Sequence, residues 1–374
     1  METNLNCLNL TRKLISFDTI NPPGRERDCA KYIGKLLESG GFRTAFYEFD
    51  QNRTSLIAHI EGYGNKAPIC FAGHMDTVPL GNMPWKKDPF RGEVEGDRLY
   101  GRGASDMKGG LTAIILTALR VANMSNSKVG ITLVITASEE TGCQGAYHLS
   151  KLDNVLSKAG AVIIAEPTSN YPLVGHKGAL WIEIRTSGVT AHGSMPEQGD
   201  NAIYKAARVV TKLKEYRFDI PSHPLFGAPT LNVGTISGGL NINSVPDQTA
   251  MGVDIRTIPG QSNKDVYESL QSYLGKEAEM SRILDTGSIM TNPEHEWIQT
   301  VFDIMEPFLK KRPVARGVTY FTDASVLTPA LGNPPTLILG PGEPTMAHKS
   351  DEFCYISKIE EAVEAYMKIA NKWR

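Results

Sequence analysis

Cysteine is scarce in this chain of 374 residues. The five cysteines are scattered and odd in number, and no two of them form a CxxC pair. A disulfide scaffold and a zinc site built on thiolates are therefore both disfavoured. Unpaired thiols fit a reducing compartment, so we expect the protein in the cytoplasm.

Long apolar runs and an excess of charge of either sign are also missing. No apolar run approaches the roughly 20 residues that span a bilayer, and the first residues lack the basic and apolar regions of a secretory signal. The 39 Lys and Arg nearly balance the 41 Asp and Glu, for a formal net charge of −2. Such a balance provides no electrostatic hold on nucleic acid or anionic lipid. We expect neither a membrane nor a nucleic-acid partner.

What remains is ordinary globular composition, 41% hydrophobic and 21% charged, in a chain long enough for two domains. Short apolar runs that end in Gly or charged residues are typical of strands buried on both faces. They cover residues 68–73, 130–137, 160–165 and 335–340. Helical stripes at 29–37, 111–122 and 359–373 lie before, between and after them. This alternation predicts an α/β domain with a mostly parallel, buried sheet.

A different pattern begins near residue 178. Leu180, Ile182 and Ile184 alternate with Glu183 and Arg185. This alternation is typical of a sheet with one face buried and the other exposed to solvent. Helical patterns at 201–216 and 263–274 and strand patterns at 231–236 and 249–256 follow. We expect an α+β domain at 177–289, inserted into a first domain that comprises 1–176 and 290–374.

Metal-binding and acid/base side chains gather where the buried strands end. His74 and Asp76 follow the first strand, Glu139 and Glu140 the second and Glu166 the third, and Asp106 lies in a glycine-rich turn before a helix. A lone histidine or an acidic pair is usually structural or solvated. Ligands of open α/β sheets, however, collect at this edge, so the joint placement favours a metal site of carboxylates and histidines.

Each residue type suits a particular task. The imidazole of His74 offers nitrogen to zinc, and Asp76, two residues on, can fix its tautomer and orientation. Asp106 is well placed to bridge two metals. Adjacent side chains diverge, so one of Glu139 and Glu140 can bind metal while the other faces the reacting water as a base.

Charge and donor type point to a second metal. Asp106, Glu140 and Glu166 supply three negative charges against two dications. A second imidazole is still needed, and His348, which follows the last apolar run, supplies it. The residues therefore predict a two-metal site.

Motifs along nearly the whole chain resemble the dizinc metallopeptidase family of succinyl-diaminopimelate desuccinylase, acetylornithine deacetylase, aminoacylase and the glutamate-releasing carboxypeptidase. In order and spacing, the matching segments are TINPPG at 19–24, GHMDTVP at 73–79, YGRGASDMKGG at 100–110, EETG at 139–142, AHGSMP at 191–196, DIRTIP at 254–259 and AH at 347–348.

The resemblance implies a ligand set. His74 and Glu166 hold one zinc, Glu140 and His348 hold the other, and Asp106 bridges them. Cobalt or manganese are possible substitutes. The peptide bond that follows Asp106 is typically cis in this family, so we expect it to be cis here.

The resemblance also implies roles for other residues. Glu139 is the general base and Asp76 orients the zinc-binding histidine. The inserted domain is a lid that commonly carries the contact of a homodimer. On it, His192 reaches the reacting carbonyl, and Asn243 and Arg256 contact the substrate.

These similarities lead us to expect a dizinc amidohydrolase that removes an N-acyl group from an amino acid or a diamino acid. Segments 320–324 and 340–348 resemble acetylornithine deacetylase more than strict desuccinylases, and Glu166 argues against an aminopeptidase. A carboxypeptidase or dipeptidase acting on short peptides is the alternative, and a non-catalytic binding protein is a third reading. Ser138 stands where many members have Asp, which we expect to loosen local hydrogen bonding without removing a ligand.

Overall fold

The computed structural model describes residues 5–63, 66–124 and 129–373. The chain divides into two compact units. Unit 1 consists of the described residues up to Gly175, Met290–Arg316 and those from Thr322 onward, and unit 2 consists of His176–Ile289 and Gly317–Phe321.

The segment Gly317–Phe321 groups with unit 2, although we expected it in the first domain. The backbone N–H of Lys177 donates to the oxygen of Val318 at 3.0 Å. Gly317 leaves room for the ring of Phe226, because a Cβ atom there would lie 1.9 Å from a ring carbon. These contacts join residues far apart in the chain and follow no periodicity, so no sequence pattern marks them.

Unit 1 is built on a six-stranded sheet in the order β1-β2-β6-β3-β7-β14. The strands are β1 (Arg43–Asp50), β2 (Arg53–Ile60), β3 (Ile69–His74), β6 (Ile131–Thr136), β7 (Ala161–Ile164) and β14 (Thr336–Ile338). The last four in spatial order pair in parallel, whereas β1 and β2 pair antiparallel and β2 joins β6 antiparallel. The expected mostly parallel sheet is confirmed, and β1 and β2 are an unpredicted addition. All residues of β3 and β7 are buried.

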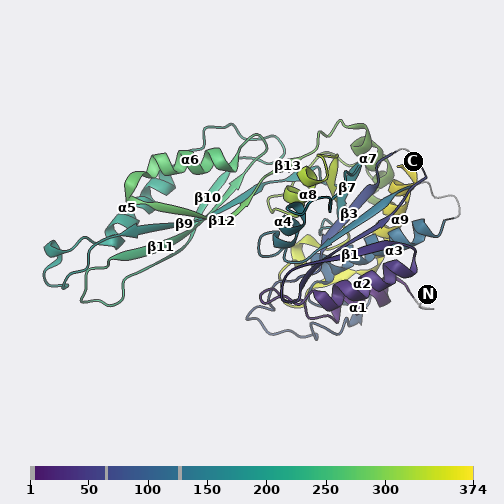
Figure 1. The fold of residues 1–374 in the computed structure, drawn as a ribbon, viewed down its shortest axis with the longest axis horizontal. Coiled ribbons are helices and arrows are strands. Elements are labelled where there is room, and N and C mark those ends of the chain that lie inside the picture. The colour runs from purple at the N-terminus through teal and green to yellow at the C-terminus, as the bar shows by residue number, and fades with distance from the viewer. Residues whose placement is uncertain (1–4, 64–65, 125–128, 374) are drawn as a thin grey trace. The chain divides into compact units, whose positions relative to one another are not determined.

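Helices cover this sheet (Figure 1). They are α1 (Cys7–Ile15), α2 (Arg27–Ser39), α3 (Gly109–Ala122), α4 (Gln144–Ser150), α7 (Glu296–Leu309), α8 (Ala324–Ala330) and α9 (Ile356–Lys372). α3 packs against α1, α9 and the central strands, and α4 packs against α8. The apolar stripe of α2 is buried, and the helix ends where Gly41 takes a positive φ of 86°. None of the described helices is long and apolar enough to cross a membrane.

Short strands complete the connections. β4 (Val94–Glu95), β5 (Arg98–Tyr100) and β15 (Phe353–Tyr355) form a small antiparallel sheet in the order β15-β5-β4. β8 (Gly175–His176) and β13 (Ile289–Met290) pair with each other. The small sheet matters for the site because β15 follows the segment that carries His348.

Unit 2 is an antiparallel sheet with helices packed on it (Figure 1). Its order is β10-β11-β9-β12, with β9 (Gly178–Ser187), β10 (Thr230–Gly238), β11 (Gln248–Thr257) and β12 (Glu279–Thr286). Helices α5 (Ala202–Glu215) and α6 (Asn263–Leu274) contact the sheet. Leu180, Ile182 and Ile184 of β9 lie in the core between sheet and helices. The alternating pattern of β9 thus predicted its buried face.

Candidate metal centre

Parallel strands bring the predicted ligands of unit 1 to one edge of the sheet. β3 ends at His74, whose partner in the parallel ladder is Thr136, the last residue of β6. Glu139 lies three residues after the end of β6, and Glu166 lies two residues after the end of β7. The carboxyl ends of parallel strands meet at the same edge. Accordingly, Nε2 of His74 lies 3.7 Å from Oε1 of Glu166.

Asp106 lies between two imidazoles. Its Oδ1 is 3.2 Å from Nε2 of His74, and its Oδ2 is 3.4 Å from Nε2 of His348. The same His348 nitrogen is 3.1 Å from Oε2 of Glu140. The carboxylate therefore faces two separate nitrogen donors, each with a further carboxylate beside it. The Asp106–Met107 peptide bond is cis, as expected.

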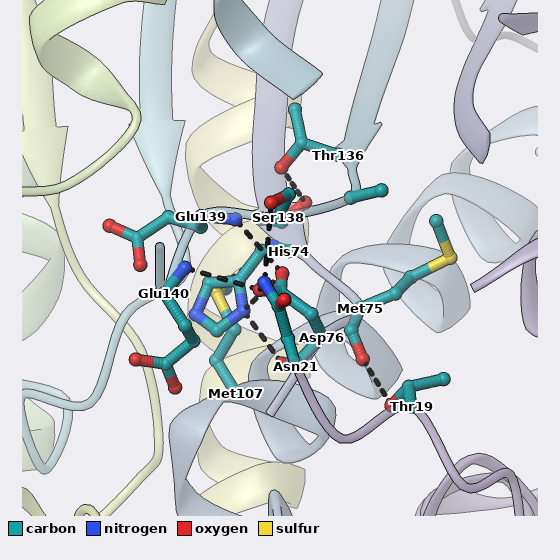
Figure 2. A network of polar contacts seen from close by, with 12 residues as sticks. Thr19, Asn21, His74, Met75, Asp76, Met107, Thr136, Ser138, Glu139 and Glu140 are labelled. Carbon is teal, nitrogen blue, oxygen red and sulfur yellow. Dashed lines mark hydrogen bonds and ion pairs between the residues drawn. The ribbon is translucent and has the colours of Figure 1, made fainter. Parts of the chain in front are cut away.

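Asp76 lies at the centre of a polar network that also includes Asn21, His74, Glu139 and Glu140 (Figure 2). Its Oδ1 accepts a hydrogen bond from the backbone N–H of Glu139 at 3.0 Å, and its Oδ2 accepts one from that of Glu140 at 3.2 Å. Nδ1 of His74 lies 3.0 Å from the backbone oxygen of Asp76 and 3.4 Å from its Oδ1. Nδ1 of His74 is therefore closer to the backbone oxygen of Asp76 than to its carboxylate. This contact leaves Nε2 to face Asp106.

The turn that follows β6 is well bonded. Ser138 takes a positive φ of 64°, and its Oγ lies 2.8 Å from Oγ1 of Thr141 and 3.0 Å from Oε1 of Gln144. It also accepts a hydrogen bond from Nδ2 of Asn21 at 3.2 Å. Hydroxyl and amide groups of three other residues therefore surround the side chain of Ser138.

Buried carboxylates crowd the centre. Burial raises the pKa of Glu139 and of Glu166 well above the usual range of glutamate. Burial, with the charge of Asp106 added, raises the pKa of Glu140 to about 7. Burial also acts to raise the pKa of Asp106, but hydrogen bonds from His348 and the other imidazole outweigh it, so that this pKa is lowered. These acids are costly to keep ionised together without a compensating cation.

The donor set fits divalent metal ions. Ligand atoms of His74, Asp106 and Glu140 all lie within 4.8 Å of one another. Oε1 of Glu140 is buried, and no described residue offers it a hydrogen bond. Imidazole nitrogen and carboxylate oxygen are donors that zinc and similar metals accept. A buried acceptor without a donor is what a cation satisfies.

Asp323 is a further buried carboxylate that we did not predict. Only 1% of its surface is exposed. Its Oδ2 accepts a hydrogen bond from the hydroxyl of Thr136, at the end of β6, whereas its Oδ1 has no partner among the described residues. Burial raises its pKa to about 6. Segment 320–324 is one of those that resemble acetylornithine deacetylase, but nothing in its sequence places this carboxylate next to the end of β6.

Of the predicted residues, His192 and Asn243 belong to unit 2 and lie in adjacent loops. The backbone N–H of Gly193 donates to the oxygen of Asn243 at 2.7 Å, and His192 forms a bridge with Ser244. The side chain of His192 is exposed, and its Nδ1 lies 2.7 Å from the hydroxyl of Ser194. The imidazole Nε2 therefore faces solvent within this unit.

Arg256 lies at the end of β11 in unit 2 and already has an acidic partner. Its Nε is 2.9 Å from Oδ1 of Asp254. The guanidinium centre lies 6.0 Å from the ring centroid of Trp181 and 5.8 Å from that of Phe321. Two rings and one carboxylate thus hold the planar group, and its remaining N–H groups are those that a further carboxylate can use.

Comparison with known proteins supports the same chemistry. The model of "Peptidase family M20/M25/M40" matches residues 70–372. A probable succinyl-diaminopimelate desuccinylase of Staphylococcus aureus is 28% identical, covering 97% of this chain and 98% of that protein. An acetylornithine deacetylase of Vibrio parahaemolyticus is 31% identical, covering 98% of each.

Solved structures share the fold. An M20 family metallo-carboxypeptidase from Sulfolobus solfataricus superposes with a TM-score of 0.82 at 19% identity, covering 98% of this chain and 99% of that one. A dinuclear metal-binding M20 peptidase of Bacillus subtilis superposes with a TM-score of 0.72 at 16% identity, covering 97% and 96%. By the match of the family model over most of its length, the chain belongs to peptidase family M20/M25/M40.

Proposed function

We propose that the protein is a dizinc amidohydrolase that removes an N-acyl group from an amino acid or a diamino acid. The observation that carries this proposal is the carboxylate of Asp106, each oxygen of which faces a different imidazole, at 3.2 Å and 3.4 Å. A carboxylate in that position suits a ligand shared by two metals. His74 and Glu166 on one side, and Glu140 and His348 on the other, complete the set.

Zinc would supply Lewis acidity and lower the pKa of a water molecule toward neutrality. The chain's own contribution is a positioned base. Glu139 is 6% exposed, and its backbone N–H is held by Asp76 at 3.0 Å. In the proposed reaction, the carboxylate of Glu139 takes a proton from the attacking water as the C–O bond forms. It then passes the proton to the amide nitrogen as the C–N bond breaks.

Residues of unit 2 would define the substrate. The N–H groups of Arg256 not used by Asp254 suit the α-carboxylate of an amino acid, which a forked guanidinium binds bidentately. His192 would donate to the carbonyl oxygen as it gains negative charge, and Asn243, in the adjacent loop, would contact the same substrate. These roles predict a small substrate with a free carboxylate beside the scissile amide.

A carboxypeptidase or dipeptidase is the second candidate. The likeness in fold to a metallo-carboxypeptidase favours it. The relatives named as a deacetylase and a probable desuccinylase are, however, 28–31% identical along the whole chain, against 19% for the carboxypeptidase. We therefore place deacylation first.

A homodimer formed through unit 2 is part of the proposal. Unit 2 exposes large apolar side chains, and β10 is an edge strand of its sheet. The exposed side chains are Val189, Met195, Ile203, Tyr204, Ile236, Leu240, Ile242, Tyr273 and Ile283. Exposed apolar groups beside an unpaired strand edge favour association with another chain. Five free, buried cysteines support a cytoplasmic location.

Subunit complementation tests the dimer and the role of His192 together. If His192 acts on its partner's site, mixing Glu139→Ala with His192→Ala subunits creates one working site in each mixed dimer. Random exchange then restores about a quarter of wild-type activity. No recovery after verified exchange would show that His192 does not act in trans.

A release assay on zinc-loaded protein tests the reaction itself. The panel includes acetylornithine, succinyl-diaminopimelate, other acetylated amino acids, folate-type glutamates and dipeptides. We expect the highest kcat/KM for an acylated amino acid, with loss of turnover after chelation and recovery with zinc. Preference for dipeptides would support the second candidate. Stoichiometric zinc without turnover on any panel member would favour a non-catalytic binding protein.

A further inference from the structure

A short N-terminal segment lies beside the turn that carries His74 and Asp76. The backbone N–H of Asn21 donates to the oxygen of Thr77 at 2.8 Å, and the N–H of Thr77 donates to the oxygen of Thr19 at 3.1 Å. The hydroxyl of Thr19 donates to the oxygen of Met75 at 2.7 Å. Residues 19–21 thus add a parallel bridge where β3 ends, and they lie outside the 70–372 match of the family model.

The side chain of Asn21 joins two turns (Figure 2). Its Nδ2 lies 2.9 Å from Oδ2 of Asp76, 3.0 Å from Oγ1 of Thr141 and 3.2 Å from Oγ of Ser138. The side chain is buried, with 3% of the residue exposed. One amide therefore ties the turn after β3 to the turn after β6.

Asp76 transmits this contact to the proposed base. The carboxylate is fully buried, and its two oxygens accept from the backbone N–H groups of Glu139 and Glu140. Without Asn21, the remaining hydrogen bond to Oδ2 among the contacts described above is the longer one, 3.2 Å, from the backbone N–H of Glu140. The carboxylate then loses the donor that opposes its rotation, and both glutamates lose a fixed anchor.

We propose that Asn21 is a positioning residue. Through Asp76, it fixes the positions of the base Glu139 and the metal-binding Glu140. The inference rests on the proposed function for its kinetic consequence, but its effect on zinc binding does not depend on the substrate. An outer partner of a metal ligand typically contributes 10–100-fold in affinity or activity.

Two variants at one position and one matched control test the proposal. Asn21→Asp keeps the size of the side chain but replaces the donor by an acceptor that faces Asp76. Asn21→Ala removes the side chain without adding charge, so it serves if the first variant does not fold. Thr19→Val removes a buried hydrogen bond of the same bridge, 2.7 Å long, which does not involve Asp76.

Each protein is measured for thermal midpoint, zinc affinity by chelator competition, and kcat and KM at saturating zinc. We expect kcat to fall about 10–100-fold in both Asn21 variants with KM changed less than threefold, and zinc affinity to fall about 10-fold or more. Thr19→Val should lower the thermal midpoint and leave kcat and zinc affinity near wild type.

Asn21 variants that match Thr19→Val in zinc affinity and kcat would overturn the proposal. If wild-type protein turns over no panel substrate, the proposed function fails while the inference is decided by zinc affinity alone. Weakened zinc binding confined to the Asn21 variants would support the inference in that case.

Discussion

Two ion pairs in unit 1 have the same nitrogen–oxygen distance but differ in burial. We expect burial to decide how much each pair contributes to the free energy of unfolding. Arg102 and Glu352 approach to 2.7 Å with 1% of each side chain exposed. Arg43 and Glu61 approach to the same 2.7 Å with 75% and 74% exposed. Water and salt screen the second pair, which is therefore worth little. Glu352→Gln and Glu61→Gln form a matched comparison.

Glu352 does more than pair with Arg102. Its oxygens also accept from the backbone N–H groups of Gly103, Ser105 and Asp106 at 2.8–3.0 Å. Burial raises the pKa of Glu352, although the guanidinium opposes the rise. Replacing both partners by apolar residues removes the cost of burying two charges, whereas removing the charge of one partner leaves the other charge buried without compensation.

The expected loss follows from that asymmetry. Breaking a buried pair costs about 3–5 kcal/mol, because the remaining charge is buried without compensation. In Glu352→Gln, the amide group also points N–H donors at an arginine or at backbone donors. With a urea dependence of about 2–3 kcal/mol per molar, the unfolding midpoint should fall by about 1–2.5 M. Glu61→Gln should leave the midpoint unchanged within error.

Urea titration of zinc-free protein, followed by tryptophan fluorescence, measures this difference. Trp85, Trp297 and Trp373, three of the four tryptophans, belong to unit 1, and the ring of Trp85 lies 5.1 Å from the guanidinium of Arg102. Fluorescence therefore reports mainly on the unit that carries the substitution. Equal midpoints for Glu352→Gln and Glu61→Gln would refute the argument from burial.

Asp106→Ala should abolish binding of both zinc ions, measured by metal analysis after dialysis, since its carboxylate is shared; full metal content would exclude a bridge. Glu139→Ala should retain both ions and lose about 10²–10⁴-fold in kcat as a general base, whereas Glu140→Ala should release one ion; equal metal loss would reverse the two roles. Arg256→Ala should raise KM for substrates with a free carboxylate more than for their amides, and a uniform effect would indicate a structural role. Burial lowers the pKa of His176 from 6.5 to about 4. As pH falls, the imidazole is therefore protonated in the unfolded chain at a higher pH than in the folded chain. The free energy of unfolding should therefore drop by about 2–3 kcal/mol between pH 7 and 4.5 in the wild type relative to His176→Phe, and parallel pH profiles would contradict this.

Strand periodicity was sufficient to place most of the candidate site. Apolar runs of six to eight residues predicted β3, β6, β7 and β14, and parallel strands present their carboxyl ends at one edge. His74, Glu139 and Glu166 follow such strands, so their proximity could be inferred before any coordinates. The same local logic identified the buried face of β9 and the stripe of α2.

Strand periodicity could not predict the residues that hold the metal-binding segments in place. Asn21 is 55 residues from Asp76, Asp323 is 187 residues from Thr136, and Glu352 stands 246 residues from Asp106. Their side chains carry no period and no spacing that points to the site, although Asn21 lay within a recognised motif. The antiparallel hairpin of β1 and β2 was missed as well, because its outer strand is largely exposed and lacks a buried run.

The sequence by itself thus determined the family, the parallel sheet and the residues with metal-binding chemistry, because these depend on local patterns of polarity and on motif spacing. Tertiary structure alone decided which neutral and acidic side chains hold those residues in place. A hydrogen bond such as that from Asn21 to Asp76, at 2.9 Å, depends on how distant segments pack, and its donor and acceptor leave no periodic trace along the chain.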